Sequence, residues 1–359
     1  MKLLDRYVLR EFLGYLLLGL LGFIVIFVVV DIFEKIDVFL DHKASAGLIA
    51  RFYLYRAPEV IVQVMPVALL LATFLGLGQL NKFGELTAMR AIGLSLMRIL
   101  IPVFAVAAAA SALALVLGEF VVPQANHERD HIYDEEIQNS RRESQTERPD
   151  LTYLGTEGRI WYARLYVVSE KRLHEVSLQE FAGDRLERRI DASEASWDGG
   201  QWVFTSGIER SFQGDSEVAK PFTRLIVPGL RETPDDFSRE TRNPDEMNYF
   251  ELRDFVERMR ASGGLVAKYL VDLHLKLAFP LVNFIVVMIG ASLATQLRLQ
   301  SAAVGFGLSV AISFLYYAFM RTGQALGHTG ALPPYTAAWL GDFVFGLFGL
   351  VMLYRAQRR

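Results

Sequence analysis

The segment His127–His131 carries the residue types and the spacing of a zinc site. Two histidines four residues apart share one face of a helix, and Glu128 would then be placed to act as a general base. Against this interpretation, Arg129 and Asp130 are charged where the helix of such a protease is buried, and no third ligand is evident in the sequence. A solvated helix is the simpler interpretation, and a membrane-bound zinc metalloprotease stays open as an alternative.

Other catalytic patterns are sparse in this chain. Its 359 residues contain no G-x-x-x-x-G-K-[ST] run, so the chain cannot hold ATP through a P-loop. Cysteine is absent, which excludes disulfides and thiolate metal sites. The formal net charge of −3 gives no basis for nucleic-acid binding. We therefore expect no enzyme active site and no cofactor bound by this chain, and a partner chain would have to hydrolyse any ATP.

A charged stretch, Asn81–Arg98, separates two long apolar runs, Pro58–Leu80 and Ile99–Val122. Each run exceeds the roughly 20 residues that a helix needs to cross a bilayer. The stretch is therefore a loop on one face of a membrane. Glu85 stands early in this loop and favours the start of a short helix, because a carboxylate is stabilised near a helix N-terminus.

Leu86, Met89 and Arg90 fall on one face of this short helix, at spacings of three and four residues. Gly84 permits a turn before the helix, and Gly93 suits a left-handed residue at its C-terminal end. A tethered amphipathic helix between two membrane spans is suited to docking on a soluble partner. The alternative is a helix that lies among the lipid headgroups.

Ionisable residues also stand close to the ends of the apolar runs. They are Glu59, Glu119, Asp272, His274, Lys276 and Asp342. Charge inside a membrane indicates function, although residues near a span end can reach water with their side chains. We expect Lys276 and Lys35 to lie at the external mouth and to pair with an anionic lipid headgroup. The alternative is that these lysines pair locally with Asp37 and Asp272.

The elements that position these residues are membrane helices. Hydrophobic residues make up 52% of the chain and the mean hydropathy is +0.27, which indicates a polytopic membrane protein. The first apolar run follows basic residues but lacks a small-residue cleavage site, so we expect an uncleaved span whose helix continues past the membrane surface. The six expected spans are Phe12–Val30, Pro58–Leu80, Ile99–Val122, Leu273–Leu293, Ala302–Met320 and Tyr335–Leu353.

The polar region from Gln124 to about Arg260 is large enough to form a domain. Its short aromatic and β-branched segments are typical of antiparallel strands in a sandwich or an open roll. The expected strands are Arg159–Val167, Val176–Phe181, Ile190–Trp197 and Gln201–Phe212. Helices are expected on either side, over Ala125–Arg142 and from Asn248 to Gly263-Gly264.

The expected fold class is an α-helical membrane protein with six spans, arranged 3+3, and an inserted antiparallel all-β domain. Residues 1–123 would hold the first three spans, 124–262 the β domain with its flanking helices, and 263–359 the last three spans. Basic residues gather at one set of span ends: Lys2, Arg6, Arg10, Lys82, Arg90, Arg98, Arg298, Arg355, Arg358 and Arg359. The opposite short loops hold Lys35, Lys43, Arg51, Arg56 and Arg321, diluted by acidic residues. The positive-inside rule therefore predicts cytoplasmic termini and an external β domain.

Five short stretches, in order along the chain, carry a resemblance to a known family. They are GELTAMRAIGLS (Gly84–Ser95), GEFVVPQ (Gly118–Gln124), MNYFEL (Met247–Leu252), KLAFP (Lys276–Pro280) and LPPYTAAW (Leu332–Trp339). Together with the 3 + β + 3 layout, they make the chain resemble the LptF/LptG family of lipopolysaccharide-export permeases over essentially its whole length. The Asp31–Glu34 and Gly118–Gln124 regions favour the LptG-like half. The chain departs from the family at Gly341-Asp342, where Pro-Asn is frequent, so no detail of the last span is carried over.

The resemblance implies the permease subunit of an ABC transporter in the bacterial inner membrane, which extracts lipopolysaccharide and passes it to a periplasmic β-jelly-roll bridge. It implies a heterodimer with a homologous six-span permease, bound to two copies of a cytoplasmic ATPase that hold ATP and Mg. The external domain would be an open, jelly-roll-like β domain in the periplasm. The short helix at about residues 83–93 would be the coupling helix, and the residues expected to couple it to the ATPase are Glu85, Leu86, Met89, Arg90 and Gly93.

Lipopolysaccharide carries several acyl chains and anionic phosphates, so its route needs an apolar interior and a basic outer rim. The rim residues that we expect to contact the lipid are Lys35, Lys276 and Arg321. Val203 and Phe204 follow a turn, so at least one of their side chains should point into the β domain, with Ile160 or Trp161 as its inward neighbour. A non-transporting scaffold, whose β domain only binds other proteins, is an alternative beside the metalloprotease.

Overall fold

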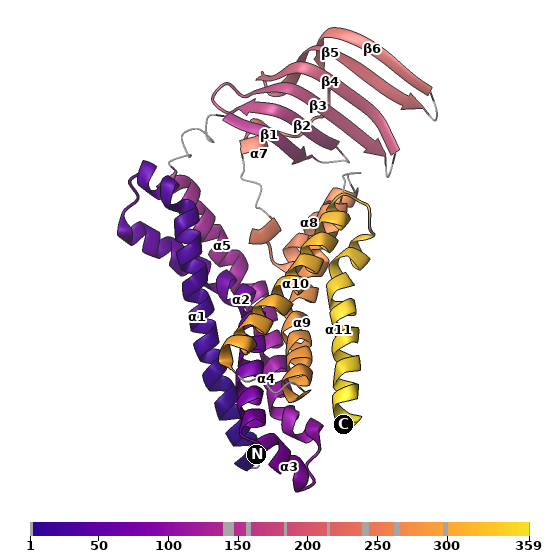
Figure 1. The fold of residues 1–359 in the computed structure, drawn as a ribbon. Coiled ribbons are helices and arrows are strands. Elements are labelled where there is room, and N and C mark those ends of the chain that lie inside the picture. Colours follow the sequence, from indigo (N-terminus) through magenta and orange to yellow (C-terminus); the bar gives the residue numbers. More distant parts are fainter. Residues whose placement is uncertain are drawn as a thin grey trace. The chain divides into compact units, whose positions relative to one another are not determined.

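The computed structural model describes residues 3–138, 147–155, 159–182, 185–213, 216–238, 244–261, 266–296 and 301–358. The chain forms two compact units, whose elements are labelled in Figure 1. The helical unit comprises Met1–Asp130, Pro244–Tyr249 and Ala267–Arg359, and the β unit comprises His131–Asn243 and Phe250–Val266. Several residues named from the sequence lie outside the described residues: Lys2, Arg142, Gly263, Gly264, Arg298 and Arg359.

Six helices of the described chain are long and apolar enough to cross a membrane, so the six expected spans are confirmed. They are α1 (Leu3–Asp41), α2 (Ala46–Lys82), the helix from α4 (Leu96–Val116) to Ile137, α9 (Ala267–Gln296), α10 (Ala302–His328) and α11 (Pro334–Arg358). The helix α1 continues past its apolar run, as expected, but α2 begins at Ala46 rather than near Pro58. Ser45 sets this earlier start, because its hydroxyl accepts the Leu48 N–H at 3.3 Å and caps the helix.

The centre of the helical unit is formed by α2 and α9. Of their apolar segments, 78% and 72% are buried, against 11% for α1. The two helices approach closely at Gly290, where a Cβ atom would lie 2.5 Å from Leu70 Cδ1. The outer helices leave large apolar side chains exposed, among them Leu18 on α1, Phe314 on α10 and Phe343 on α11. In a membrane these faces contact lipid or another subunit.

The third membrane helix contains two π-helical turns. Its parts beyond α4 are η1 (Leu117–Val121), α5 (Val122–His131) and η2 (Ile132–Ile137), and the segments that return from the strands are η3 (Pro244–Glu246) and α8 (Tyr249–Ala261). The carboxylate of Glu119, in η1, accepts the Tyr249 N–H at 2.8 and 3.0 Å. In α5, the Asn126 side chain donates to the Asp245 carbonyl at 3.3 Å. These contacts hold Pro244–Tyr249 within the helical unit.

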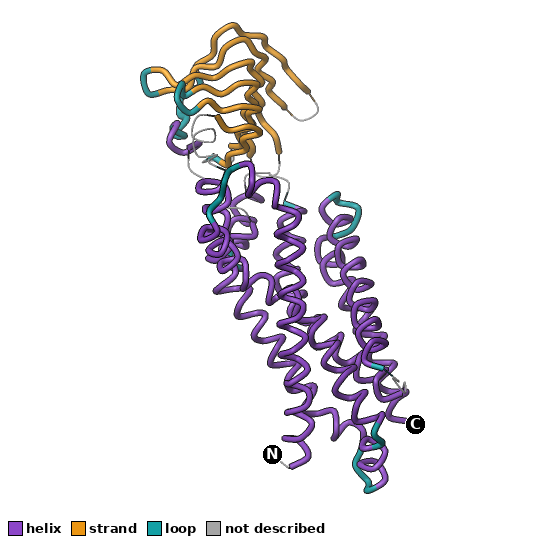
Figure 2. Tube along the Cα trace, turned by 60° about the vertical axis from the view of Figure 1, so that its left-hand side comes forward, coloured by secondary structure: helices purple, strands orange, loops and turns teal. Residues whose placement is uncertain are grey.

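The β unit contains one six-stranded antiparallel sheet, drawn in orange in Figure 2, and its strands follow the order β1-β2-β3-β4-β5-β6, as labelled in Figure 1. Its elements are β1 (Glu147–Leu154), β2 (Arg159–Val167), β3 (Arg172–Ala182), β4 (Arg185–Asp198), β5 (Gln201–Gln213), β6 (Ser216–Ile226) and the short helix α7 (Pro234–Ser238). The antiparallel all-β insert is confirmed, and the four expected strands correspond to β2–β5. Among the described residues the sheet is a single open layer with β1 and β6 at its edges.

One face of this sheet carries the core of the β unit, and Phe237 from α7 covers it. The Phe237 ring lies 5.1 Å from the Trp161 ring and 5.3 Å from the Trp202 ring, measured between centroids. The Trp202 indole N–H donates to the Glu232 carbonyl at 2.8 Å, which holds the chain just before α7 against the sheet. Buried aromatic rings supply much of a small core, so α7 belongs to the folded β unit rather than to a loose linker.

Candidate functional site

The expected short helix between the second and third spans is present as α3 (Glu85–Ala91). Gly84 before it has a φ of 74° and Gly93 after it a φ of 89°, a region that glycine adopts without steric cost. Ser95 then caps the next membrane helix, since its hydroxyl accepts the Arg98 N–H at 3.3 Å. Two glycine turns and a cap therefore set the bounds of α3 between α2 and α4.

The two long faces of α3 differ in their surroundings. Leu86 is 3% exposed and lies in the core of the helical unit, and Met89 packs against the same core. Glu85 is half-buried and accepts a hydrogen bond from the Tyr7 hydroxyl at 2.9 Å, while Arg90 is exposed. Leu86 and Met89 thus fasten α3 to its own chain, and Arg90 and part of Glu85 stay accessible to a partner.

Two exposed apolar residues flank α3 and were not among the residues expected to couple. Phe83 is 68% exposed and Ile92 is 78% exposed. Each stands beside one of the two glycines, Gly84 and Gly93. The signal that would have found them is an apolar residue next to each glycine turn of a charged loop. With Arg90, they give α3 a mixed apolar and basic outer surface, which suits a protein partner.

Lys35, on α1, forms an ion pair with Asp31 one turn earlier, at 2.7 Å. The same carboxylate pairs with Arg56 of α2 at 3.0 Å and accepts the Tyr53 hydroxyl at 2.8 Å. The local partner of Lys35 is therefore Asp31 and not Asp37. Sequence reasoning missed Arg56 at this site, because its contact with Asp31 joins two helices; the four-residue spacing of Asp31 and Lys35 was the only local signal.

The other two expected rim residues lie on other helices. Lys276 is half-buried on α9, and Arg321 is exposed on α10, where it donates to the Gln324 side chain at 2.9 Å. Gln324 in turn donates to Asp272 at 3.0 Å, and His328 lies 2.9 Å from the same carboxylate oxygen. Asp272 is thus held by two residues of α10. The three basic residues Lys35, Lys276 and Arg321 come from α1, α9 and α10.

Of the expected interior residues of the β domain, Trp161 and Phe204 lie on the covered face of the sheet, and their neighbours Ile160 and Val203 point to the opposite face, because successive side chains of a strand alternate. Trp161 and Phe204 are fully buried and stack at 5.7 Å, and Val203 is also buried. Ile160 is half-buried. Trp161 and Phe204 line an apolar surface that Phe237 covers.

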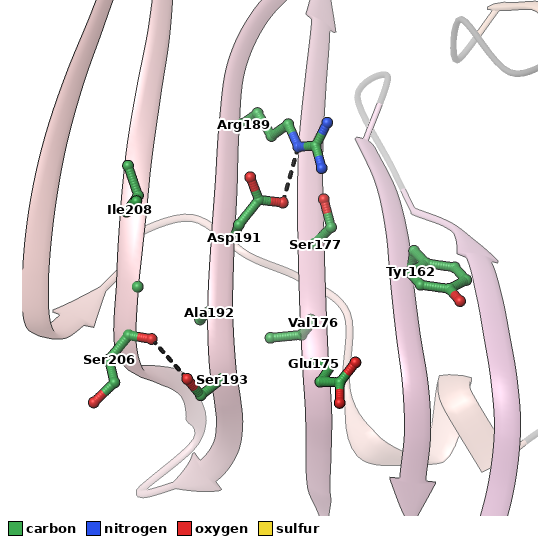
Figure 3. Close-up of a pocket in the computed structure, with 11 residues that line it drawn as sticks. Tyr162, Glu175, Val176, Ser177, Arg189, Asp191, Ala192, Ser193, Ser206 and Ile208 are labelled. Carbon is green, nitrogen blue, oxygen red and sulfur yellow. Dashed lines mark hydrogen bonds and ion pairs between the residues drawn. The ribbon is translucent and has the colours of Figure 1, made fainter.

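A depression of about 480 Å³ lies on the sheet across β2 to β5 (Figure 3). Its charged lining is already paired: Asp191 accepts Arg189 at 2.8 Å and Arg210 at 3.0 Å. The Ser193 hydroxyl donates to the Ser206 carbonyl at 3.1 Å. Ser177 also lines the depression, and among the described residues its buried hydroxyl has no hydrogen-bond partner.

The residues of the H-E-x-x-H motif have separate partners. His127 Nδ1 lies 2.8 Å from Glu246 Oε2, and His131 Nε2 lies 3.0 Å from Glu135 Oε2. Arg129 pairs with Glu59 of α2. In the part of the chain that the structure describes, no group of three His, Cys, Asp or Glu residues is placed to hold a metal. Each histidine of the motif therefore lies against a separate carboxylate.

Glu128→Gln is expected to leave zinc content and thermal stability unchanged, because the Glu128 side chain is exposed. Arg129→Gln is the matched variant, and it should lower stability by about 1–3 kcal/mol by removing the cation that pairs with the partly buried carboxylate of Glu59. Metal analysis and thermal unfolding of the purified protein measure both effects. Loss of bound zinc and of proteolytic activity in Glu128→Gln would instead support the metalloprotease alternative.

Similarity to known proteins extends over nearly the whole chain. The family model described as lipopolysaccharide export system permease LptF/LptG matches residues 6–355. The lipopolysaccharide export system permease protein LptG of Escherichia coli (strain K12) is 23% identical over 370 residues, which cover 98% of this chain and 98% of the relative. The LptG protein of Escherichia coli O6:H1 matches with the same identity and coverage. The chain therefore belongs to the LptF/LptG family of lipopolysaccharide export permeases.

Proposed function

We propose that this chain is the permease subunit of an ABC transporter that extracts lipopolysaccharide from the inner membrane and is powered by a separate cytoplasmic ATPase. The observation that carries the proposal is α3, a knob that is fastened inward by Leu86 and presents Phe83, Arg90 and Ile92 outward. The chain itself has no P-loop. A short helix of this kind can transmit a conformational change of a soluble ATPase to the membrane helices as a rigid-body shift.

The proposed orientation has both termini and α3 in the cytoplasm and the β unit in the periplasm. Its support is the basic residues at the span ends near α3, among them Arg6, Lys82 and Arg355, which the positive-inside rule places in the cytoplasm. The proposed partners are a homologous six-span permease and two copies of the ATPase. The exposed apolar faces of α1, α10 and α11 offer the second permease a membrane surface, and two subunits would enclose a cavity that six helices rarely form.

The proposed substrate contacts follow the chemistry of lipopolysaccharide. Lys35, Lys276 and Arg321 would pair with its phosphates at the outer rim. The acyl chains would then pass along the covered face of the sheet. They would move toward a periplasmic bridge of β-jelly-roll domains, which would add its strands to an edge of the sheet. Because Phe237 covers Trp161, α7 would have to move aside before an acyl chain could reach that surface.

A photo-crosslinking amino acid at Phe204 is expected to capture lipopolysaccharide, and only when the assembled transporter is supplied with ATP. The reason is that the Phe204 side chain lies on the covered apolar face, which lipid would reach only during transport. Capture is measured by ultraviolet irradiation of membranes and detection of the lipid-linked protein. The matched control is the same amino acid at Tyr162, which is 41% exposed and neighbours Trp161 on β2.

The proposed route is contradicted if Phe204 and Trp161 both fail to capture lipid while export continues. Capture at Tyr162 alone would place the route on the opposite face of the sheet. Equal capture with and without ATP would mean that the lipid partitions there without being driven.

A non-transporting scaffold is distinguished by what copurifies with the chain from its native membrane. A scaffold does not need ATP hydrolysis, so we expect an ATPase and a second six-span protein to copurify only if the chain works as a permease. Recovery of the chain without any ATPase, from membranes that export lipopolysaccharide, would favour the scaffold.

A further inference from the structure

Asp31 sits where three donors from two helices converge. The residue is 5% exposed, and its carboxylate pairs with Lys35 at 2.7 Å and with Arg56 at 3.0 Å through the same oxygen. Its second oxygen accepts the Tyr53 hydroxyl at 2.8 Å. Two cations thus share one buried anion, and the three charged side chains together carry a formal charge of one positive unit.

Arg56 depends on Asp31 for its close ion pair. Glu59 is the other acid near Arg56, but it lies 4.0 Å away and is already bound by Arg129 of α5. Among the described residues, the Arg56 Nε atom is buried without a hydrogen-bond partner. Its guanidinium also lies 5.5 Å from the centre of the Phe27 ring on α1. Asp31 is therefore the close acidic partner of Arg56, and within the described part of the chain the guanidinium keeps at least one N–H donor that is not hydrogen-bonded.

Lys35 and Arg56 remain accessible in spite of this shared carboxylate. Their side chains are 22% and 18% exposed, whereas the Asp31 side chain is 6% exposed. An anion that approaches this site therefore meets the two cations first. It must then share them with Asp31, whose negative charge repels it at close range.

We propose that Asp31 is a built-in competitor for the phosphate groups of the transported lipid, and that Arg56 is a further residue that contacts those phosphates. The inference rests on the proposed function. When no lipid is bound, the Asp31 carboxylate pairs with both Lys35 and Arg56. When lipid is bound, the carboxylate competes with the lipid phosphates for these two cations, which lowers the affinity for the headgroup and allows it to leave. A transporter needs such a limit, because a site that binds too tightly releases slowly.

Asp31→Asn removes the competing charge but keeps a side chain of the same shape that can still accept hydrogen bonds. The variant is expected to bind lipopolysaccharide about threefold to tenfold more tightly and to export it more slowly, since one close charge interaction is worth up to about a factor of ten. If Asp31 only ties α1 to α2, the same variant should bind less lipid or the same amount. The direction of the change therefore separates the two roles.

The experiment uses the full-length chain, purified with its native partners and placed in nanodiscs of phosphatidylcholine. Purified lipopolysaccharide, dephosphorylated lipopolysaccharide and phosphatidylglycerol are titrated in separate arms. The gain in affinity should be present for lipopolysaccharide and absent for its dephosphorylated form. Adding Arg56→Gln to Asp31→Asn should cancel the gain. Asp5→Asn is the matched control, because it also removes one carboxylate of α1, one that pairs with Arg98 at 2.8 Å, and it should change nothing.

Weaker or unchanged binding by Asp31→Asn overturns the inference, and so does a gain confined to phosphatidylglycerol. Asp31→Ser, which is smaller and uncharged, tests the same expectation if the Asn variant is recovered in poor yield. If the wild-type assembly binds no lipopolysaccharide, the proposed function fails. If the wild type binds it and both variants bind no more tightly, only the role of Asp31 fails.

Discussion

Replacing Glu85 by lysine is expected to reduce the recovery of the ATPase with this chain by at least about tenfold, because truncating a desolvated charge pair costs about 2–5 kcal/mol. Glu85 begins α3, and its half-buried carboxylate has one described partner within the chain, the Tyr7 hydroxyl. A lysine would oppose both that contact and any cation of the partner. Lipopolysaccharide export in cells should stop with the loss of the ATPase. Affinity purification of a tagged chain, followed by quantification of the ATPase, measures the effect.

Tyr7→Phe separates the contact within the chain from the contact with the partner. It removes the hydroxyl that Glu85 accepts and leaves the carboxylate in place. The variant should keep nearly all of the ATPase, since one exposed hydrogen bond is worth about 0.5–1.5 kcal/mol. If Tyr7→Phe loses the ATPase as fully as Glu85→Lys, the carboxylate acts by positioning α3. If Glu85→Lys keeps both the ATPase and export, α3 does not dock through this residue.

The sequence was sufficient to predict that α3 exists, because its determinants are local. Gly84 and Gly93 permit the two turns, and Glu85 stands at the start of the helix. The sequence could not show which face of the helix stays accessible. Leu86 and Met89 form an apolar stripe that would fit a partner or the chain's own bundle, and only the packing of the bundle decides between them.

The strands show the same limit. The interior strands β2–β5 follow from their aromatic and β-branched residues, but β6 contains Lys220 and Pro221 and does not look like a strand. Proline is tolerated at the edge of a sheet, where one side of the strand has no neighbour to bond. An edge strand is thus specified by its partner, here β5, more than by its own residues.

The contacts around Asp31 could not be predicted for a related reason. Its pairing with Lys35 is a local spacing of four residues, whereas Arg56 and Tyr53 reach it from another helix. Helix packing fixes such contacts, and in this chain small residues fix the packing.

Gly323→Leu on α10 is expected to destabilise the helical unit by at least about 3 kcal/mol, at the upper end of the cost of overpacking. A Cβ atom at Gly323 would lie 2.5 Å from the backbone carbonyl oxygen of Ala337 on α11. A backbone atom cannot rotate away as a side chain can, so α10 and α11 would have to separate. The variant should therefore be recovered in low yield and should lose export.

Gly307→Leu is the matched control, because it makes the same change on the same helix. A Cβ atom at Gly307 would meet nothing within 4 Å, and leucine favours a helix over glycine by about 1 kcal/mol. This variant should be as stable as the wild type or slightly more so, and thermal unfolding in detergent compares the two. Equal stability of both variants would show that α10 and α11 can separate at Gly323 without cost. Such freedom would make this contact a moving joint of the permease, whereas a large difference between the variants means that α10 and α11 move as one body.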